Sequence, residues 1–141
     1  MITFTIPGPP RGKGRPKFFR RGNFVGTYTD KETTSYENLV KTAFRLIHCG
    51  APKEGPLSVK ITSFFPIPAS STKKFKIEAS TEDVPVIKKP DGDNIIKVIL
   101  DALNQIAFRD DAQIYDVRCV KLYSNNPRTI VQIDDEIKLQ F

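Results

Sequence analysis

The sequence predicts an α+β fold in which one mixed or antiparallel sheet packs against two main helices. Two stretches with apolar residues at helical spacing occur among runs that alternate apolar and polar residues, in the order strand, helix, strand, helix, two strands. The length of 141 residues suits a single domain, which we expect to span residues 1–141. With 39% hydrophobic residues, the chain can form a packed core, and intrinsic disorder is excluded.

The first strand is expected at residues 3–6, where polar and apolar residues alternate. Residues 7–22 contain four prolines and several glycines, so they cannot form a regular helix and are poor as a strand. A short strand is predicted at residues 24–28.

The first helix is expected from about Asp30 to Cys49. Thr29 and Glu32 have the spacing of a capping box, in which the Thr side chain caps the helix start. Apolar residues then recur at helical spacing, and Gly50 is a natural stop.

The residue pattern in the second half of the chain predicts three strands and two helices. A half-buried strand is expected at residues 57–65, and a short basic helix at residues 71–79. Residues 94–107 are mostly apolar and predict a largely buried helix. The last two strands, at residues 113–123 and 128–133, are separated by a turn sequence and predict a hairpin.

The excess positive charge is confined to the N-terminal segment. The chain has 22 Lys+Arg and 16 Asp+Glu, a net charge of +6. Residues 1–29 contain no acid, so they carry the whole excess and form a basic segment. The segment either contacts a polyanion, most often nucleic acid, or is a solvated loop. Its candidate DNA-binding residues are Arg11, Lys13, Arg15, Lys17, Arg20 and Arg21.

Several classes of protein are excluded by what the sequence lacks. His48 is the single histidine and the two cysteines form no CxxC pair, which argues against a zinc site and a disulfide scaffold. No apolar run is long enough to span a membrane, and the N-terminus has no signal-peptide pattern, so we expect a cytoplasmic protein without a membrane partner. Residues 12–15 lack the spacing of a P-loop, so no nucleotide cofactor is expected.

Two aspartates stand at the start of the second predicted main helix. Pro90 and Gly92 make a tight approach to this helix, and Asp91 and Asp93 flank the glycine. A helix N-terminus favours negative charge, so one interpretation is that Asp91 or Asp93 is simply an N-cap. The other is that a divalent cation relieves the repulsion between the two carboxylates and takes oxygen ligands from them.

Lys97 and a second pair of acids extend this pattern. Lys97 follows Asp93 by four residues, so both lie on one face of the helix. It either forms an ordinary ion pair with Asp93 or Asp101, or it holds a phosphate beside the metal. Asp110 and Asp111 follow the helix and form either a charged turn or, if the next strand returns beside the first acids, part of one site. Aspartates with one lysine and no histidine or cysteine suit Mg²⁺ acting on a phosphodiester.

These residues resemble the RusA family of Holliday-junction resolvases. The family has an Asp-x-Asp-Asn-x-x-Lys core, then Leu-Asp-Ala-Leu, then Asp-Asp-x-Gln-(Ile/Val). In this chain the motifs are residues 91–97, 100–103 and 110–114. Residues 89–90 and 12–16 also look like phage and prophage versions of the family, and weaker similarity covers most of the chain.

The resemblance implies a RusA-like fold and a homodimeric, Mg²⁺-dependent crossover junction endodeoxyribonuclease, with Mn²⁺ as a substitute ion, that acts in DNA recombination and repair. Such an enzyme resolves four-way DNA junctions by paired symmetric nicks, since a twofold dimer offers two equivalent active sites. The resemblance gives metal-binding roles to three of the catalytic residues and makes the lysine essential: Asp91, Asp93, Asp111 and Lys97. Three neighbours are expected to support the site: Asn94, Asp101 and Asp110.

Two alternatives stay open. The chain could be a non-catalytic protein that binds branched DNA, or a nuclease that acts on forks or flaps. Phe18 and Phe19 in the basic segment either stack on DNA or belong to the core.

Overall fold

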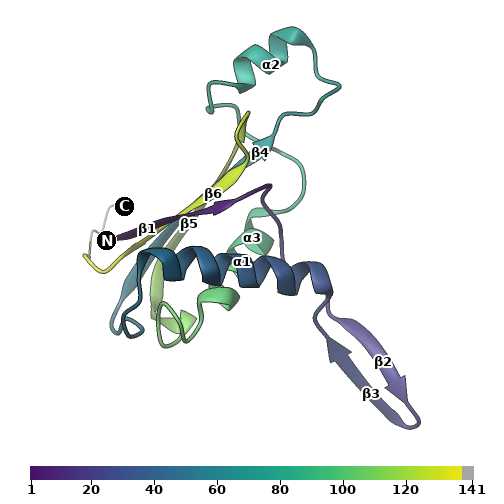
Figure 1. Ribbon diagram of the computed structural model, residues 1–141, viewed down its shortest axis with the longest axis vertical. Coiled ribbons are helices and arrows are strands. Elements are labelled where there is room, and N and C mark those ends of the chain that lie inside the picture. Colours follow the sequence, from purple (N-terminus) through teal and green to yellow (C-terminus); the bar gives the residue numbers. More distant parts are fainter. Residues whose placement is uncertain (138–141) are drawn as a thin grey trace.

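A four-stranded sheet forms the centre of the computed structural model, which describes residues 1–137 (Figure 1). In spatial order its strands are β1 (Ile2–Pro7), β6 (Arg128–Asp134), β4 (Leu57–Pro66) and β5 (Ile114–Ser124). β4 runs parallel to β5 and antiparallel to β6, and β1 is antiparallel to β6. The α+β class with a mixed sheet is therefore confirmed. The predicted range 1–141 includes residues 138–141, which lie outside the described residues.

The predicted hairpin between the last two strands is wrong. β5 and β6 follow one another in the sequence, but β4 lies between them and hydrogen-bonds to both. Ile61 of β4 stands opposite Cys119 of β5 on one side and Val131 of β6 on the other. Ile61 is fully buried and Phe64 is buried on the opposite face, so β4, which is buried along most of its length, takes a central place with a strand paired to each of its edges.

Two helices, α1 (Lys31–Ile47) and α3 (Gly92–Leu103), pack against one another and against one face of the sheet. The core between them is continuous and contains residues from both helices and from β1, β4 and β6, while partly buried residues of β5 pack against it. Its largest fully buried side chains are Phe44, Phe108, Ile6, Leu57, Ile61, Ile95, Ile99, Leu103 and Ile133. The helices therefore hold the start of α3 at the edge of a rigid core.

The boundaries of both helices differ slightly from the prediction. Asp30, not Thr29, caps α1: its carboxylate accepts the Thr33 N–H at 3.1 Å. α3 ends at Leu103 rather than at Ala107, because Asn104 has an extended backbone conformation and the chain turns there. Ala107 and the residue after it are then buried in the core as part of a turn instead of a helix.

Two extensions leave the body in opposite directions (Figure 1). One is a hairpin of β2 (Lys17–Arg21) and β3 (Phe24–Tyr28), which we call the arm. The expectation that residues 7–22 are poor as a strand is wrong for β2, because the prolines end at Pro16 and the next five residues contain neither proline nor glycine. The strand predicted at residues 24–28 is confirmed.

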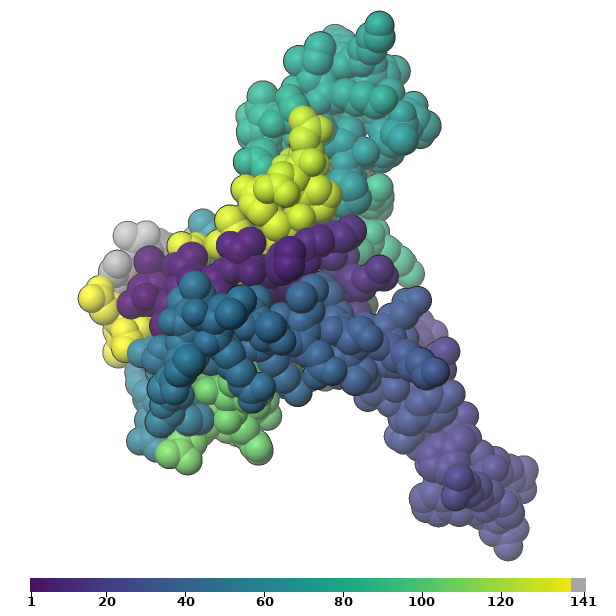
Figure 2. Space-filling model, in the orientation of Figure 1, coloured from purple at the N-terminus to yellow at the C-terminus, as the bar shows by residue number. Residues whose placement is uncertain are grey.

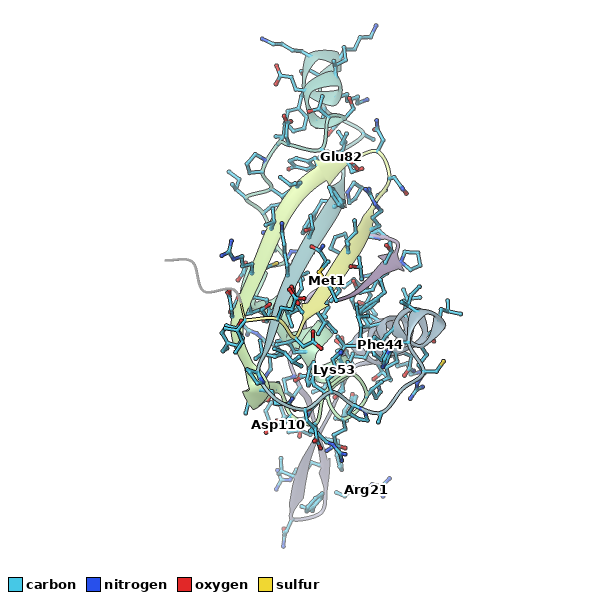
Figure 3. All side chains as sticks on the ribbon, turned by 90° about the vertical axis from the view of Figure 1, so that its left-hand side faces the viewer. Met1, Arg21, Phe44, Lys53, Glu82 and Asp110 are labelled. Carbon is cyan, nitrogen blue, oxygen red and sulfur yellow. The ribbon has the colours of Figure 1, made fainter. Side chains whose placement is uncertain are left out.

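The other extension carries the short basic helix α2 (Lys73–Ala79), which confirms the helix expected there. Its return to the body is held by Glu82, which accepts hydrogen bonds from Ser124 and, at 2.8 Å, from Arg128. Figure 3 shows Glu82 near one end of the molecule and Arg21 near the other. Within residues 1–137, the helices are all too short or too polar to cross a membrane.

Candidate active site

The start of α3 presents a carboxylate that no backbone group uses. Asp91 is at the N-cap position, yet its side chain makes no capping hydrogen bond. The peptide bond between Lys89 and Pro90 that leads into it is cis. Asp93 lies in the first turn and is exposed. The simple interpretation of Asp91 as a side-chain cap therefore fails, and both carboxylates are free for another partner.

One strip along α3, exposed at Asp93 and Lys97 and half-buried at Asp101, carries the charged residues of the site. Asp93, Lys97 and Asp101 follow at intervals of four, while Ile95, Val98, Ile99 and Ala102 are buried on the other side. The predicted position of Lys97 on the same face as Asp93 is thus consistent with the helix. Within residues 1–137 the Lys97 ammonium takes part in none of the ion pairs. The interpretation that Lys97 forms an ordinary ion pair with Asp93 or Asp101 therefore does not hold.

Asp110 and Asp111 lie just before β5, at a 3₁₀ turn, η1 (Asp111–Gln113). Asp110 occupies the N-cap of the turn, and its N–H donates to the Gln113 side chain at 2.9 Å. The hydrogen bond with Asp110 is the main cause that raises the pKa of Asp111, and burial and the charges of Asp110 and Asp101 raise it further, while Lys97 lowers it. The segment between α3 and β5 thus places Asp111 where the charges of Lys97 and Asp101 act on it.

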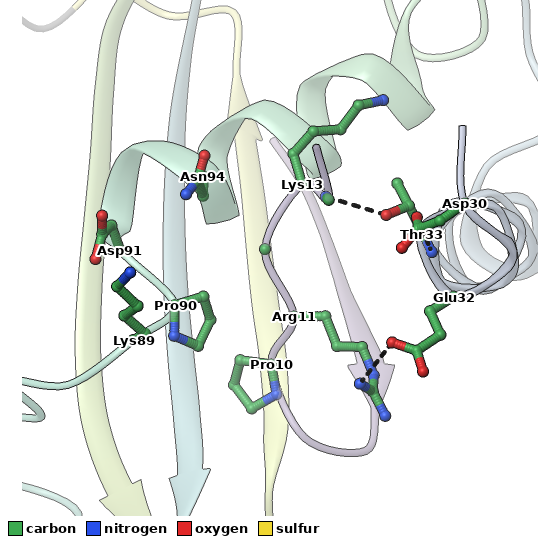
Figure 4. Close-up of a pocket in the computed structure, with 12 residues that line it drawn as sticks. Pro10, Arg11, Lys13, Asp30, Glu32, Thr33, Lys89, Pro90, Asp91 and Asn94 are labelled. Carbon is green, nitrogen blue, oxygen red and sulfur yellow. Dashed lines mark hydrogen bonds and ion pairs between the residues drawn. The ribbon is translucent and has the colours of Figure 1, made fainter. Parts of the chain in front are cut away.

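Part of the basic segment, residues 10–14, is fixed against the two helices, and we call it the docked loop. The Lys13 N–H donates to the Asn94 carbonyl of α3 at 3.0 Å. The Gly14 N–H donates to the Thr33 hydroxyl of α1 at 3.0 Å. Figure 4 shows the loop passing between the start of α3, with Asp91 and Asn94, and the start of α1.

Lys13 is neutralised inside the protein. Its ammonium lies 3.2 Å from a carboxylate oxygen of Glu37 on α1 and 3.2 Å from one of Asp101 on α3, and its side chain is 20% exposed. Burial alone would lower the pKa of Lys13, but the hydrogen bonds to Glu37 and Asp101 raise it. Lys13 therefore joins the docked loop, α1 and α3 beside the acidic strip.

A cavity of about 380 Å³ lies beneath the docked loop. Its walls come from the docked loop, the start of α1 and the residues that lead into α3. Arg11 reaches across its rim to Glu32, with 4.0 Å between guanidinium and carboxylate. The cavity combines cations, exposed carboxylates and backbone, a lining that suits a phosphate group next to a cation.

The donor chemistry fits a hard divalent cation, since every candidate ligand is a carboxylate oxygen. Within residues 1–137, no three His, Cys, Asp or Glu side chains are close enough together to hold a metal ion. The structure thus relates Asp111 to Asp110, Asp101 and Lys97, but does not bring Asp91, Asp93 and Asp111 into one three-ligand cluster. Mg²⁺ does not require such a cluster, because it commonly keeps several waters and binds one or two carboxylates together with a substrate phosphate.

The remaining candidate DNA-binding residues lie outside the docked loop. Arg15 is exposed between the loop and the arm, and Lys17, Arg20 and Arg21 are exposed on β2. Phe18 and Phe19 are on the arm and not in the core, with 74% and 38% of their surface exposed.

Glu37 is a site residue that the sequence did not reveal. It lies on α1, where buried residues recur every three or four positions in the ordinary pattern of an amphipathic helix. Its partner Lys13 is 24 positions away, and no local spacing links the two. A weak local signal did exist, because Glu37 follows Thr33 by four residues and precedes Val40 by three, which places an acid at the border of the buried face of α1.

Exposed aspartates, an exposed lysine and a basic loop lie together at one helix start, a combination that suits contact with nucleic-acid phosphates. Residues 7–134 match the family described as Endodeoxyribonuclease RusA. The chain belongs to the RusA endodeoxyribonuclease family, which points to a nuclease of the Holliday junction resolvase type. It is also similar to the Uncharacterized protein YqaN of Bacillus subtilis (strain 168), with 31% identity over 134 residues, or 94% of each chain.

Proposed function

We propose that this protein is a Mg²⁺-dependent, structure-specific endodeoxyribonuclease that resolves four-way DNA junctions by paired symmetric nicks as a homodimer. The observation that carries the proposal is the start of α3, where the carboxylate of Asp91 stands at an N-cap without a capping bond. A buried or capped aspartate would be unavailable to an ion, whereas Asp91 and the exposed Asp93 are available. Such an enzyme works in the cytoplasm of a bacterial or phage-infected cell.

The proposed ligands of the ion are Asp91, Asp93 and Asp111. When bound, Mg²⁺ supplies an activated water and neutralises charge that develops on the scissile phosphate; Mn²⁺ serves as a substitute. Asp111 is preferred over Asp110 because Asp110 already belongs to the cap of η1. The raised pKa of Asp111 reflects a carboxylate beside other carboxylates, and a cation would relieve this repulsion.

Lys97 is proposed to bind the scissile phosphate. Its ammonium is exposed on the same strip as Asp93 and, within the described residues, takes part in none of the ion pairs. Asn94 and Asp101 are proposed to support the site through the docked loop, since one accepts the Lys13 N–H and the other accepts the Lys13 ammonium.

The other basic residues are proposed to contact backbone phosphates: Arg11, Arg15, Lys17, Arg20 and Arg21. Phosphate contacts give affinity and position the protein without reading sequence, which suits an enzyme that recognises the shape of a junction. A twofold dimer would present two equivalent active sites to the two equivalent strands near the crossover.

The deciding experiment is cleavage of a labelled immobile four-way junction beside a fork and a plain duplex, with Mg²⁺, with Mn²⁺ and with a chelator. The junction is expected to be cut in two equivalent strands near the crossover, and only with a divalent ion present. Asp91→Asn, Asp93→Asn and Asp111→Asn should abolish cutting while junction binding persists or increases, because the substitutions remove ligands and also repulsion against phosphate.

A matched control is Asp116→Asn, which removes an acid from β5 that stands beside Ser58 on the sheet face opposite the helices. This variant should cut at the wild-type rate. Binding without any cleavage by the wild-type protein would favour the non-catalytic alternative. Preferred cleavage of the fork would favour the nuclease of other branched DNA. An Asp91→Asn variant that cuts normally would overturn the ligand assignment.

A further inference from the structure

The arm is exposed on both faces and stands away from the body of the molecule (Figure 2). β2 and β3 pair only with each other, and every residue in them except Gly26 is exposed. A two-stranded hairpin in water is marginally stable without a surface to pack on. Aromatic side chains on such an exposed hairpin therefore indicate a surface that binds a partner.

One face of the arm carries a continuous strip of three rings. Phe19 lies in the middle, with its ring centroid 6.0 Å from that of Phe24 and 6.3 Å from that of Tyr28. The register explains the strip, because Phe19 stands opposite Gly26 and its ring lies across the glycine. A Cβ at position 26 would come within 2.5 Å of that ring, so Gly26 is needed for this arrangement.

Cations stand at both ends of this aromatic strip. Lys17 is paired with Tyr28 and Arg21 with Phe24, so both cations belong to the face that carries the rings. The opposite face carries Phe18, which is more exposed than any ring of the strip, at 74% against 62%, 51% and 38%. The two faces thus differ in ring contacts, with three neighbouring rings on one and a single ring on the other.

The positive charge around the aromatic strip indicates what kind of partner it binds. Residues 1–29 contain no acid, so a partner that approaches the arm is favoured if it is negatively charged. The rings need flat apolar groups, and the flanking cations need anions spaced along the same ligand. An unpaired nucleic-acid strand has both features, since every base has a face that stacks on an aromatic ring and every linkage has a phosphate.

We propose that the strip of Phe24, Phe19 and Tyr28 is a stacking surface for unpaired bases of branched DNA, a role that rests on the proposed function and names the part of the substrate that the arm contacts. Paired bases inside a duplex hide their faces, so the strip would favour strands that are open at a branch point. The arm would thus add preference for open structure to the phosphate contacts made by its cations.

The test measures binding without cleavage, in the absence of divalent ions. The probes are a single-stranded oligonucleotide that contains 2-aminopurine and the matching duplex, both at about 0.2 M salt so that phosphate contacts are weakened. In the double variant Phe24→Ala, Tyr28→Ala, binding to the single strand should fall by about tenfold for each base that no longer stacks, and the change in 2-aminopurine fluorescence should disappear. Duplex binding and the salt dependence of affinity should stay unchanged, since no charge is removed.

The matched control is Phe18→Ala, which removes a more exposed ring from the opposite face of the same hairpin and should leave single-strand binding within twofold. A conservative pair, Phe24→Tyr with Tyr28→Phe, keeps the rings and should restore binding, which excludes collapse of the arm as the cause of the reduced affinity. Wild-type single-strand affinity in the double variant, or an equal reduction with Phe18→Ala, would overturn the proposal. Vesicles of anionic lipid provide a further arm of the experiment: loss of vesicle binding alone in the double variant would assign the strip to a membrane surface instead.

This test separates the stacking role from the nuclease. If the wild-type protein cuts junctions while the double variant keeps single-strand binding, the stacking role fails and the proposed function stands. If the wild-type protein cuts no DNA but binds single strands through the strip, the proposed function fails and the stacking role stands.

Discussion

The docked loop and the arm are neighbours in one basic segment, yet they have opposite surroundings. In the docked loop, Lys13 is held by two carboxylates and is mostly buried. In the arm, the cations Lys17, Arg20 and Arg21 are exposed and take part in none of the ion pairs that residues 1–137 form. A run of like charges therefore does not have one role: the tertiary structure pairs some cations inside the protein and leaves others exposed to a partner.

The largest expected change is in junction affinity when the cations of the arm are removed. The triple variant Lys17→Ala, Arg20→Ala, Arg21→Ala should reduce the slope of log affinity against log salt by about 0.9 for each phosphate that is no longer neutralised, and it should weaken junction binding about a hundredfold near 0.1 M salt. The measurement is junction affinity across a salt series. The control removes the same number of cations from α2, at the opposite end of the molecule, through Lys73→Ala, Lys74→Ala and Lys76→Ala. Equal slopes in the two triple variants would mean that the arm contributes only net charge.

The second-largest expected change is in stability and cleavage rate when Lys13 of the docked loop is replaced. Lys13→Ala leaves Glu37 and Asp101 without their shared cation, so we expect a decrease of about 1–2 kcal/mol in the free energy of unfolding. Because the loop no longer aligns α1 and α3 beside the acidic strip, single-turnover cleavage at saturating protein should fall about tenfold. The salt slope should stay unchanged.

The control for the docked loop is Arg15→Ala, an exposed cation two positions away. This variant should change the salt slope but not the cleavage rate at saturation. A Lys13→Ala variant with a reduced salt slope and normal cleavage at saturation would show that Lys13 acts like the arm cations.

A smaller effect is expected when the loop is displaced without a change in charge. A Cβ at Gly12 would lie 2.8 Å from the Pro90 Cβ and 3.1 Å from the Asn94 Cβ. Gly12→Ala should therefore push the docked loop off the start of α3 and lower stability by about 1 kcal/mol, with a few-fold decrease in the cleavage rate. Thermal unfolding and cleavage on one preparation test this. Unchanged stability together with unchanged cleavage would mean that the loop position is not coupled to the site.

The smallest expected change in stability is at Glu82, which lies away from both the docked loop and the arm. The hydrogen bond from Arg128 is the main cause that lowers the pKa of Glu82, and the one from Ser124 adds to it. A carboxyl whose pKa is lowered by folding stabilises the protein above its ordinary value of 4.5, and this contribution disappears as pH falls through the folded value.

Glu82→Gln should therefore lower the free energy of unfolding at pH 7 by no more than about 1 kcal/mol. The difference from the wild type should shrink in denaturant melts as the pH is lowered below 4.5. Cleavage and the salt slope should be normal at neutral pH, since this residue touches neither the docked loop nor the arm. A difference that persists in acid would exclude the ion pair as its cause.

The candidate site could be predicted from the sequence only in part. Asp91, Asp93 and Lys97 were recognisable because a helix and its start have local signals, and the four-residue interval alone places side chains on one face. The role of Lys13 could not be predicted, because its partners are 24 and 88 positions away and meet it only after α1 and α3 pack. The expected convergence of Asp91, Asp93 and Asp111 likewise depends on long-range packing and is not seen as a three-ligand cluster within residues 1–137.

By itself, the sequence determined the α+β class, the two main helices, the acidic start of α3 and the location of the excess charge. These properties follow from local periodicity, capping and composition, which act within a few turns of the chain. Only the tertiary structure decided that β4 separates β5 from β6, that Lys13 is neutralised, and that Phe19, Phe24 and Tyr28 form one uncovered strip. The physical reason is that strand order, ion pairing and ring packing depend on which distant surfaces are buried together, and no local interval in the sequence specifies that.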